Sequence, residues 1–297
     1  MYRDTQCTFL QFLHSRMGNY AYVWGMWERL SIWGQKVREQ TLWRMREGKL
    51  WVKALADLML PRTCLVCGRK LGLQEEHLCL YCLAEMPRTY FWDSSHNSMA
   101  DKINGLIQEG LETSVPDGNT DRRMRERYAY ACALFFFQDE GDYRNILYSL
   151  KYGGNTAAGE YFGMMLGRKM ASAEHFADVD TVIPVPLHWT RRWKRGYNQA
   201  EYIAAGVSEA MGIELRTDIL FRRKRTATQT KVDVKQKRRN VLGAFEAVKN
   251  DHEASHILLV DDLFTTGATL YACYWAIRKI YPSVRISFAT LGYVGRP

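Results

Sequence analysis

The stretch His256-Ile-Leu-Leu-Val-Asp-Asp-Leu-Phe-Thr-Thr-Gly-Ala-Thr-Leu270 decides the fold of this chain. It contains an apolar strand at residues 257–260, two adjacent carboxylates, and a turn that opens a helix expected over residues 268–280. A strand that is apolar on both faces is typical of a parallel sheet covered by helices. Ligands of such sheets bind outside the carboxyl ends of the strands. The stretch therefore predicts an α/β fold with a ligand site at residues 261–269.

The turn after this strand has the chemistry of a sugar phosphate site. The first turn of a helix presents free N–H groups and the positive end of the helix dipole, and both favour a phosphate. Gly267 allows a close approach of the backbone. Hydroxyl donors come from the threonines of the turn, Thr265, Thr266 and Thr269. Asp261 and Asp262 would repel a phosphate, but they can accept hydrogen bonds from sugar hydroxyls. The alternative is an ordinary strand–turn–helix junction with capping threonines and solvated aspartates. In either case we expect Asp262 and Gly267 to sit at a surface turn.

Segments with strand and helix character alternate from residue 127 onward, which predicts a parallel sheet with helices on both faces. Strands are expected at residues 127–137, 181–185, 257–260 and 284–291, and helices at 142–151, 157–171, 200–211 and 268–280. Residues 83–125 are polar and irregular, which suits a connector better than a core. We therefore expect the main domain over residues 126–297.

Four of the seven cysteines form the pairs Cys64-x-x-Cys67 and Cys79-x-x-Cys82. Two such pairs are typical of a tetrahedral zinc site in which each pair supplies two thiolates. Because the protein fills all four positions, the zinc is expected to be structural. Residues 64–82 are therefore expected to form a small zinc module.

Composition narrows the class of protein. The 297 residues are 47% apolar and 25% charged, which excludes an intrinsically disordered chain. The formal net charge of +9 points to anionic partners. No run approaches the roughly 18 to 20 apolar residues of a membrane span, and residues 1–25 lack a secretory pattern. We expect a cytoplasmic protein without an integral membrane span.

The segment Val260-Asp-Asp-Leu-Phe-Thr-Thr-Gly-Ala-Thr269 resembles the phosphoribosyl pyrophosphate loop of type I phosphoribosyltransferases. Further segments resemble the competence-associated ComF branch, as does the upstream four-cysteine module. They are Leu150-Lys-Tyr-Gly-Gly-Asn155, Ile183-Pro-Val-Pro-Leu-His188, Arg195-Gly-Tyr-Asn-Gln-Ala-Glu201, Arg225-x-x-x-Gln229 and Arg238-Arg-Asn-Val-x-Gly-Ala-Phe245. The resemblance covers about residues 46–297. It implies a type I phosphoribosyltransferase-like sheet preceded by a zinc module.

The resemblance also implies residue roles. Asp261 and Asp262 would hold the ribose 2- and 3-hydroxyls. The 5-phosphate would lie on Thr265, Thr266, Gly267, Ala268 and Thr269. Arg195 and Gly196 would lie nearest the pyrophosphate, with Lys151 as a second candidate. The alternatives are that Arg195 is a surface cation and that Lys151 interacts with the dipole at the end of its helix.

The implied reaction is displacement at ribose C1 with pyrophosphate leaving, assisted by cations and Mg²⁺. No side chain identifies itself as a general base, although His188 is the nearest candidate. The chain is thus either a ComF-like phosphoribosyltransferase acting in DNA uptake or a non-catalytic protein that binds single-stranded nucleic acid and uses the site as a sensor. A salvage or amidotransferase-type enzyme is a weaker third reading, since no glutaminase domain is present. The expected partners are phosphoribosyl pyrophosphate, single-stranded DNA and DNA-uptake proteins such as a helicase.

Residues 222–239 carry nine basic side chains and one acid. In this fold the segment would cover the site as a hood, closing over pyrophosphate or following a nucleic-acid backbone. Trp189, Trp193 and Tyr197 alternate with cations beside it and offer stacking platforms.

The first 44 residues have no counterpart in the resemblance and are expected to be a poorly ordered extension. Residues 45–63 read as one amphipathic helix. A segment lying on a membrane surface is the alternative for this aromatic, basic region.

Overall fold

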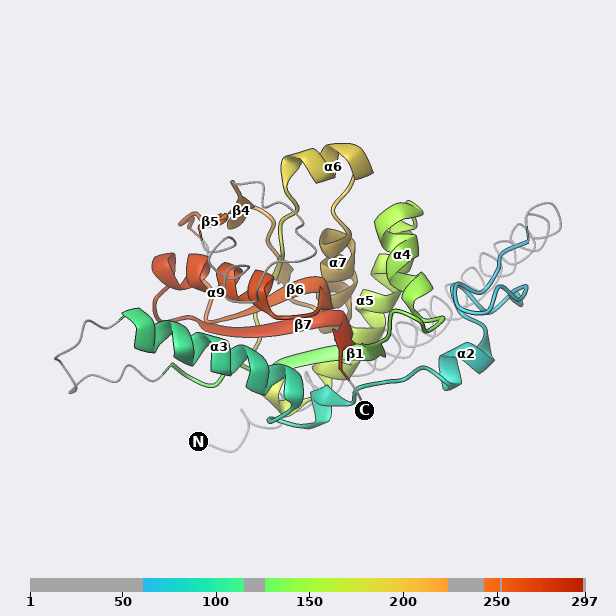
Figure 1. Ribbon diagram of the computed structural model, residues 1–297, viewed down its shortest axis with the longest axis horizontal. Helices are drawn as coiled ribbons and strands as arrows, with labels where there is room; N and C mark the ends of the chain where they lie inside the picture. The colour runs from blue at the N-terminus through green and yellow to red at the C-terminus, as the bar shows by residue number, and fades with distance from the viewer. Residues whose placement is uncertain (1–60, 115–125, 224–242, 252, 296–297) are drawn as a thin grey trace, which may run out of the picture. The chain divides into compact units, whose positions relative to one another are not determined.

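The computed structural model describes residues 61–114, 126–223, 243–251 and 253–295 (Figure 1). The predicted extension, nearly all of the predicted amphipathic helix and most of the basic segment lie outside these residues. The chain divides into two compact units, Met1–Arg62 with Gly72–Gln74, and Thr63–Leu71 with Glu75–Pro297. In the described part of the first unit, Arg62 Nη2 donates a hydrogen bond to the Gly72 carbonyl oxygen at 3.2 Å. The second unit holds the sheet and the candidate sites.

A five-stranded parallel sheet forms the centre of the second unit, in the order β1-β7-β6-β2-β3. Strands β1, β7 and β6 lie side by side in Figure 1. The strands are β1 (Ala131–Phe137), β2 (Thr181–Pro184), β3 (Glu214–Leu215), β6 (His256–Phe264) and β7 (Arg285–Val294). Strand β6 extends beyond the predicted 257–260 because the carboxylates continue the ladder, with Asp261 opposite Thr290 of β7. The expected parallel sheet flanked by helices, with a four-cysteine module at its N-terminal side, is confirmed.

Helices cover both faces of the sheet, as the alternation predicted. One hydrophobic cluster joins β6 to α3 (Ser98–Ser114) and α9 (Ala268–Ile280), and the other joins β6 to α4 (Arg144–Tyr152), α5 (Thr156–Ala171) and α7 (Gln199–Met211). Ile257 and Leu259 belong to the first cluster, whereas Leu258 and Val260 belong to the second. Successive side chains of a strand point to opposite faces, so this apolar run buries both sides of the sheet.

The backbones of helices α5 and α7 approach each other closely enough to leave no room for side chains at the contact. A Cβ atom at Gly163 would lie 2.1 Å from the Ile203 carbonyl oxygen, and one at Gly206 would lie 2.1 Å from the Glu160 carbonyl oxygen. Only glycine permits this approach, and α7 packs in turn on β6 and β2. The contact fixes α7 against the sheet, with its first residue beside the carboxyl end of β6.

The interval at residues 83–125 differs from the predicted connector. Its described part holds the end of α2 (Leu80–Ala84), the short helix η1 (Phe91–Asp93) and the 17-residue helix α3. Met99, Ile103 and Ile107 of α3 are fully buried in the core. Their spacing of four residues places them on one face of the helix, so this interval contributes to the core.

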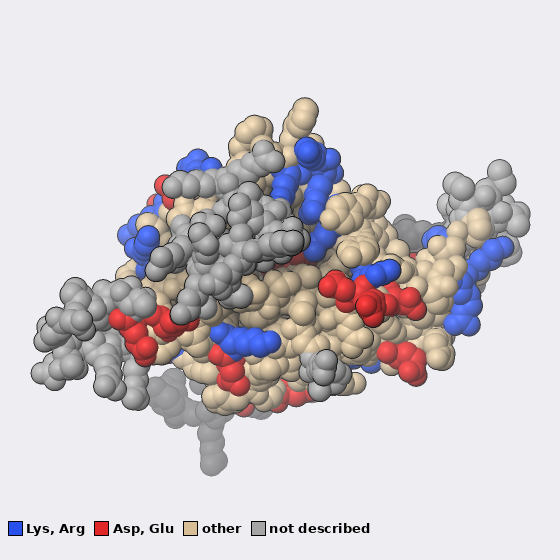
Figure 2. Space-filling model, in the orientation of Figure 1, with Lys and Arg blue, Asp and Glu red and all other residues tan. Residues whose placement is uncertain are grey.

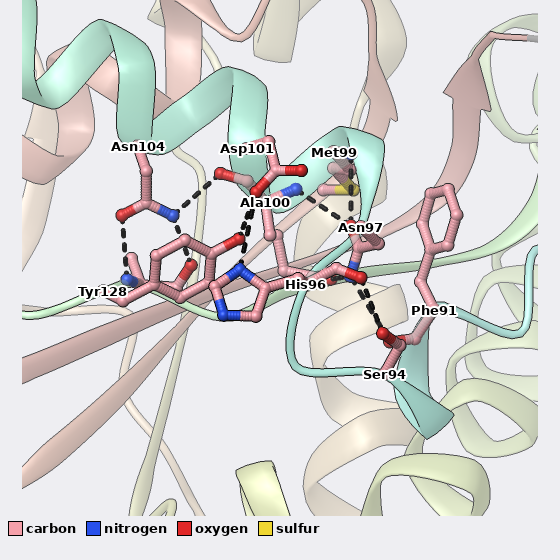
Figure 3. A network of polar contacts seen from close by, with 11 residues as sticks. Phe91, Ser94, His96, Asn97, Met99, Ala100, Asp101, Asn104 and Tyr128 are labelled. Carbon is pink, nitrogen blue, oxygen red and sulfur yellow. Dashed lines mark hydrogen bonds and ion pairs between the residues drawn. The ribbon is translucent and has the colours of Figure 1, made fainter.

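The side chains of two asparagines hydrogen-bond α3 to the segment that enters β1 (Figure 3). Asn97 Oδ1 caps the helix by accepting from the N–H groups of Met99 and Ala100 at 3.1 and 2.9 Å, while Asn97 Nδ2 donates to the Ala131 carbonyl at 2.9 Å. The Asn104 amide bonds both the N–H and the carbonyl of Ala129, at 2.9 and 2.8 Å. These bonds satisfy backbone groups beside an edge strand, which would otherwise be open to pairing.

The remaining elements are η2 (Glu174–Phe176), α6 (Trp189–Arg195) and a two-stranded antiparallel sheet of β4 (Leu220–Arg222) and β5 (Phe245–Ala247). The basic segment begins in β4, and the part of it that the structure does not describe lies between β4 and β5 in the sequence. Among the described residues, no helix has the length and apolar character needed to cross a membrane.

Candidate functional site

The turn between β6 and α9 requires its glycine for local reasons. Gly267 has φ +76°, a conformation that L-residues rarely adopt. A Cβ atom there would lie 2.9 Å from Phe264 Cζ and 3.1 Å from Leu106 Cδ1. Gly267 is buried, so the expectation that it sits at a surface turn is wrong. The side chains of Phe264 and Leu106 therefore pack closely against the inner side of the turn.

The predicted phosphate-binding residues all lie in this turn at the start of α9. Thr265 is exposed, Thr266 and Thr269 are half-buried, and Ala268 is buried. The N-cap residue Gly267 supplies no side-chain acceptor to the first N–H groups of α9. Asparagine side chains cap α5 and α7, through Asn155 and Asn198. The start of α9 can therefore receive an external acceptor such as a phosphate oxygen.

Asp262 is buried, with 6% of its surface exposed. Lys151 Nζ lies 3.2 Å from Asp262 Oδ2, and Gln199 Nε2 donates to the same oxygen at 3.1 Å. The expectation that Asp262 sits at a surface turn is therefore wrong. The structure brings Lys151 from α4 and Asp262 from β6 together as an ion pair.

Gln199 is a residue of the cluster that the sequence did not single out. Its Oε1 accepts from Arg195 Nη1 at 3.0 Å while its Nε2 donates to Asp262. Gln199 thereby joins two predicted site residues, Arg195 and Asp262. The available signal was its place in the segment Arg195-Gly-Tyr-Asn-Gln-Ala-Glu201. Gly196 ends α6 in a left-handed conformation at φ +80° and is exposed.

Asp261 has a different environment from Asp262. Its Oδ1 accepts from the Asp262 backbone N–H at 2.8 Å. Enclosure by the protein raises the pKa of Asp261 to about 8, and the negative charge of Asp262 adds to the effect, whereas Lys151 and Arg222 oppose it. With a pKa of about 8, Asp261 is mostly protonated at neutral pH, and its ionisation would bring it into repulsion with Asp262. A magnesium ion or a set of hydroxyl donors would relieve it.

His188 serves a structural role in this region. Its side chain is only 4% exposed, and its Nδ1 accepts from the Thr190 N–H at the start of α6, at 3.3 Å. The same nitrogen lies 2.8 Å from Thr190 Oγ1. One ring nitrogen of the nearest general-base candidate is thus committed to capping.

The four cysteines of the module converge on one point. The sulfur atoms of Cys64, Cys67, Cys79 and Cys82 all lie within 4.8 Å of one another. Cys67 Sγ and Cys79 Sγ are 3.8 Å apart, far longer than a disulfide of about 2.05 Å. Tetrahedral zinc with Zn–S bonds of about 2.3 Å separates its sulfurs by roughly 3.8 Å. The donor set and its spacing therefore fit a metal ion.

Backbone and arginine donors favour the thiolate of Cys79, whereas burial raises the pKa of the Cys82 thiol. The Cys82 N–H and Arg69 Nη2 lie 3.5 and 3.3 Å from Cys79 Sγ. The hydrogen bond from Cys82 and that from Arg69 lower the pKa of Cys79 to about 6, against the effect of burial. Gly68, at φ +72°, closes the first knuckle by donating its N–H to the Cys64 carbonyl at 2.9 Å.

The module packs directly on the α/β domain. Cys64, Cys79 and Cys82 belong to the same hydrophobic cluster as Phe135 of β1, and Tyr143 Oη donates to the Cys82 carbonyl at 2.8 Å. The His77 ring stacks edge-on against Tyr161, with centroids 5.2 Å apart, in keeping with a packing role.

Comparisons with known proteins found relatives whose names refer to competence and to DNA utilization. The chain is 38% identical over 103 residues to competence protein F of Haemophilus influenzae, a match that covers 34% of this chain and 45% of that protein. It is 33% identical over 91 residues to the DNA utilization protein YhgH of Escherichia coli O157:H7, covering 31% of this chain and 40% of that protein. The matched parts thus span less than half of either relative.

No protein-family model matches the chain. Among solved structures, glutamine phosphoribosylpyrophosphate amidotransferase from B. subtilis is similar over 46% of this chain and 26% of that one, with 20% identity and a TM-score of 0.31. That likeness is too slight to carry an argument. The sequence matches, together with the clustered cysteines and the parallel sheet, show that the chain is a homologue of competence protein F and YhgH, as its ComF-like motifs implied.

Proposed function

We propose that the β6–α9 turn binds phosphoribosyl pyrophosphate with Mg²⁺ and that the chain has a ComF-like role in DNA uptake. In this proposal the 5-phosphate caps the start of α9, and Asp261 and Asp262 face the ribose hydroxyls. Lys151 and Arg195 supply the positive charge on the pyrophosphate side. Mg²⁺ supplies charge neutralisation for the pyrophosphate and the two carboxylates.

The observation that carries the proposal is the arrangement around Asp262. A buried carboxylate shares one lysine with a second carboxylate whose pKa is raised, next to a helix start that has no side-chain cap. Perturbed carboxylates of this kind cluster at functional sites. Four distant segments converge here, namely the ends of α4, α6 and β6 and the start of α7. A purely structural junction would not need them.

The role in DNA uptake is supported by the relatives, which are named competence protein F and DNA utilization protein YhgH. The cytoplasmic location expected from the sequence is part of the same proposal. A DNA-uptake helicase remains the kind of protein partner that we expect.

A non-catalytic sensor is the second candidate, and the position of His188 favours it. Because one of its ring nitrogens caps α6, the nearest general-base candidate is constrained. In this reading the phosphoribosyl ligand is bound but not consumed, and the bound form controls the handling of single-stranded DNA.

Calorimetry with phosphoribosyl pyrophosphate and Mg²⁺ tests the site. Asp262→Asn should weaken binding about ten- to hundredfold, since a hydrogen bond to a charged group contributes on the order of 1.5–3 kcal/mol. Asp142→Asn is the matched control, because Asp142 is exposed at the other end of α4. Equal affinity of wild type and Asp262→Asn, with both folded, would contradict the site. Release of pyrophosphate over time would separate enzyme from sensor.

We further propose that the ion at the four cysteines is zinc and that it is structural. Four sulfur ligands leave no open position for substrate, and three of the cysteines are buried. Elemental analysis of the purified protein should find about one zinc per chain.

A further inference from the structure

Asp262, which is proposed to hold a ribose hydroxyl, already has partners within the protein. Its Oδ2 accepts from Gln199 Nε2 at 3.1 Å and lies 3.2 Å from Lys151 Nζ. The side chain of Asp262 is 9% exposed and that of Lys151 is 20% exposed, whereas Gln199 is only 6% exposed. Lys151 is therefore the donor that lies nearer to solvent, and a ligand hydroxyl that approaches Oδ2 from solvent takes its place.

Lys151 is also one of the two cations proposed to contact the pyrophosphate. If it stayed on Asp262 while pyrophosphate was bound, the carboxylate and the pyrophosphate would share one ammonium charge. That arrangement leaves an excess of negative charge in a nearly buried place, which is costly. The balance of charge is better when Lys151 pairs with the pyrophosphate and neutral hydroxyl donors bind the carboxylate.

The position of Lys151 at the end of α4 allows such an exchange of partners. Lys151 is the last residue but one of the helix, and its ammonium group is carried on a flexible four-carbon stem. Tyr152, the last residue, lies under Arg195, whose guanidinium is 5.5 Å from the centroid of the ring. The end of α4 thus contacts both the carboxylate on β6 and the cation at the end of α6, so a change of side-chain rotamer carries the ammonium group from one toward the other.

The charge on α6 indicates which part of the ligand moves Lys151. The sequence of this helix, Trp-Thr-Arg-Arg-Trp-Lys-Arg, contains four cations and no acid, and lysine and arginine side chains gather over it in Figure 2. The ion pair between Arg192 and Glu201, at 2.9 Å, compensates part of the charge and leaves the helix basic. Pyrophosphate carries most of the negative charge of the ligand, so it is the group that this surface attracts.

We propose that Lys151 changes partners when ligand binds and thereby makes the site selective for a ligand that carries both ribose and pyrophosphate. Without ligand, Lys151 blocks Asp262. Pyrophosphate draws the ammonium group away, and a ribose hydroxyl takes its place on Asp262 Oδ2 while Gln199 keeps the carboxylate oriented. Ribose 5-phosphate has no pyrophosphate, so it must break the ion pair without compensation and binds weakly. This inference rests on the proposed binding of phosphoribosyl pyrophosphate.

The test divides the ligand into its two halves and uses calorimetry on the full chain with Mg²⁺. Ribose 5-phosphate is titrated with and without saturating inorganic pyrophosphate. In wild type, pyrophosphate should strengthen the binding of ribose 5-phosphate about tenfold or more, since a hydrogen bond to a charged group changes affinity roughly ten- to hundredfold. Without the exchange, the two anions would only repel each other, and pyrophosphate would leave this affinity unchanged or lower.

The variant Lys151→Gln tests whether this residue is responsible. It removes the ion pair, so pyrophosphate should no longer strengthen the binding of ribose 5-phosphate, and phosphoribosyl pyrophosphate should bind more weakly than to wild type. The matched control is Lys169→Gln, which removes the same charge from an exposed position on α5 and should keep the coupling of wild type. Circular dichroism shows whether the variants are folded. The wild-type measurement is decisive even if the unpaired Asp262 destabilises Lys151→Gln.

The outcomes separate this inference from the proposed function. Equal coupling in wild type and in folded Lys151→Gln would assign the effect to Mg²⁺ shared by the two half-ligands and would overturn the inference. A wild-type protein that binds phosphoribosyl pyrophosphate but shows no coupling would also overturn it, while the ligand site itself would stand. A protein that binds none of the three compounds would contradict both the ligand site and the exchange at Lys151.

Discussion

The two ends of strand β6 both carry charged side chains, but they differ in how these charges are satisfied. At the amino end, His256 Nδ1 lies 2.8 Å from Asp178 Oδ1 and its Nε2 lies 2.8 Å from Ser287 Oγ. Asp180 accepts from the backbone N–H groups of Ser255 and His256 at 2.8 and 3.2 Å. Each of these polar groups has a protein partner, which is the pattern of a structural network.

At the carboxyl end the two neighbouring carboxylates are not both stable as anions. Asp261 and Asp262 share Lys151, burial raises the pKa of Asp261, and the first turn of α9 has no side-chain cap. The sites where local rules are broken are the expected places for function. The comparison teaches that a buried carboxylate by itself indicates little, whereas a conflict between buried charges indicates a ligand.

The cysteine module extends this comparison, because four sulfurs converge there with Arg69 as the nearby cation. Cys79→Ser should give the largest effect of all. It should abolish metal binding and unfold residues 63–85, because a structural zinc contributes on the order of 10 kcal/mol to small domains. Elemental analysis and limited proteolysis measure both results. The control His77→Asn should keep its zinc, since His77 packs on Tyr161. A Cys79→Ser variant that lacks metal but is as stable as wild type would contradict a structural role of the metal.

Next in size is the effect of adding a methyl group at the β6–α9 turn. Gly267 and Gly196 both have positive φ, but a Cβ atom at Gly196 meets nothing within 4 Å. Gly196→Ala should cost only the conformational strain, about 1–2 kcal/mol, and Gly267→Ala should cost more because Phe264 and Leu106 must move. Urea unfolding measures both. Equal losses would show that the turn is looser than its contacts indicate.

The pH dependence of stability should have opposite signs at the two ends of β6. The pKa of Asp261 is raised, so the folded state holds a proton that the unfolded state releases, and stability falls as the pH rises from about 4 to about 8. Burial lowers the pKa of His256 below 6.5, so stability falls as the pH drops through that value. The free energy of unfolding of Asp261→Asn should therefore exceed that of wild type by roughly 1 kcal/mol or more between pH 5 and 8.

His256→Gln is the partner variant in this experiment. It should remove the loss of stability that begins just below pH 6.5 and leave the alkaline side unchanged, as measured by melting temperature across pH. If the loss of stability at alkaline pH that wild type shows persists in Asp261→Asn, the two carboxylates are not in conflict.

The smallest effect is expected at Gln199. Gln199→Met removes the hydrogen bonds to Asp262 and Arg195 but keeps the length of the side chain, and the ion pair between Lys151 and Asp262 remains. Each hydrogen bond to a charged group contributes on the order of 1.5–3 kcal/mol, but Gln199 acts on the ligand only through Asp262 and Arg195. Affinity for phosphoribosyl pyrophosphate should therefore fall about tenfold or less. Calorimetry on Gln199→Met and Gln199→Glu measures it. A Gln199→Met that binds as wild type would reduce Gln199 to a helix-packing residue.

Much of this architecture could be predicted from the sequence, because apolar strands and spaced cysteines are local signals. The run at 257–260 identified the central strand, and the helix at residues 268–280 was predicted at its observed bounds. Helix α3 was missed because its interval was judged by polar composition. The apolar spacing of Met99, Ile103 and Ile107, together with the cap Asn97, was present in the sequence.

The environment of the candidate site could not be predicted in the same way. The burial of Asp262 depends on Lys151 and Gln199, which lie 111 and 63 residues away in the chain. The position of Gln199 depends in turn on the glycine contacts between α5 and α7. Such long-range contacts are set by packing, so the chemistry of the turn could be read from its residues but its burial could not.

Amide hydrogen exchange of the full chain, with and without phosphoribosyl pyrophosphate and Mg²⁺, tests the central claim most directly, because it reads both ends of β6 in one sample. Occupancy of the turn should slow exchange at the start of α9 and the start of α7. Exchange at residues 255–257, at the amino end, should stay unchanged. Protection confined to the amino end, or none at residues 265–271 under saturating ligand, would contradict the claim that the conflict between the two carboxylates at the carboxyl end marks the ligand site.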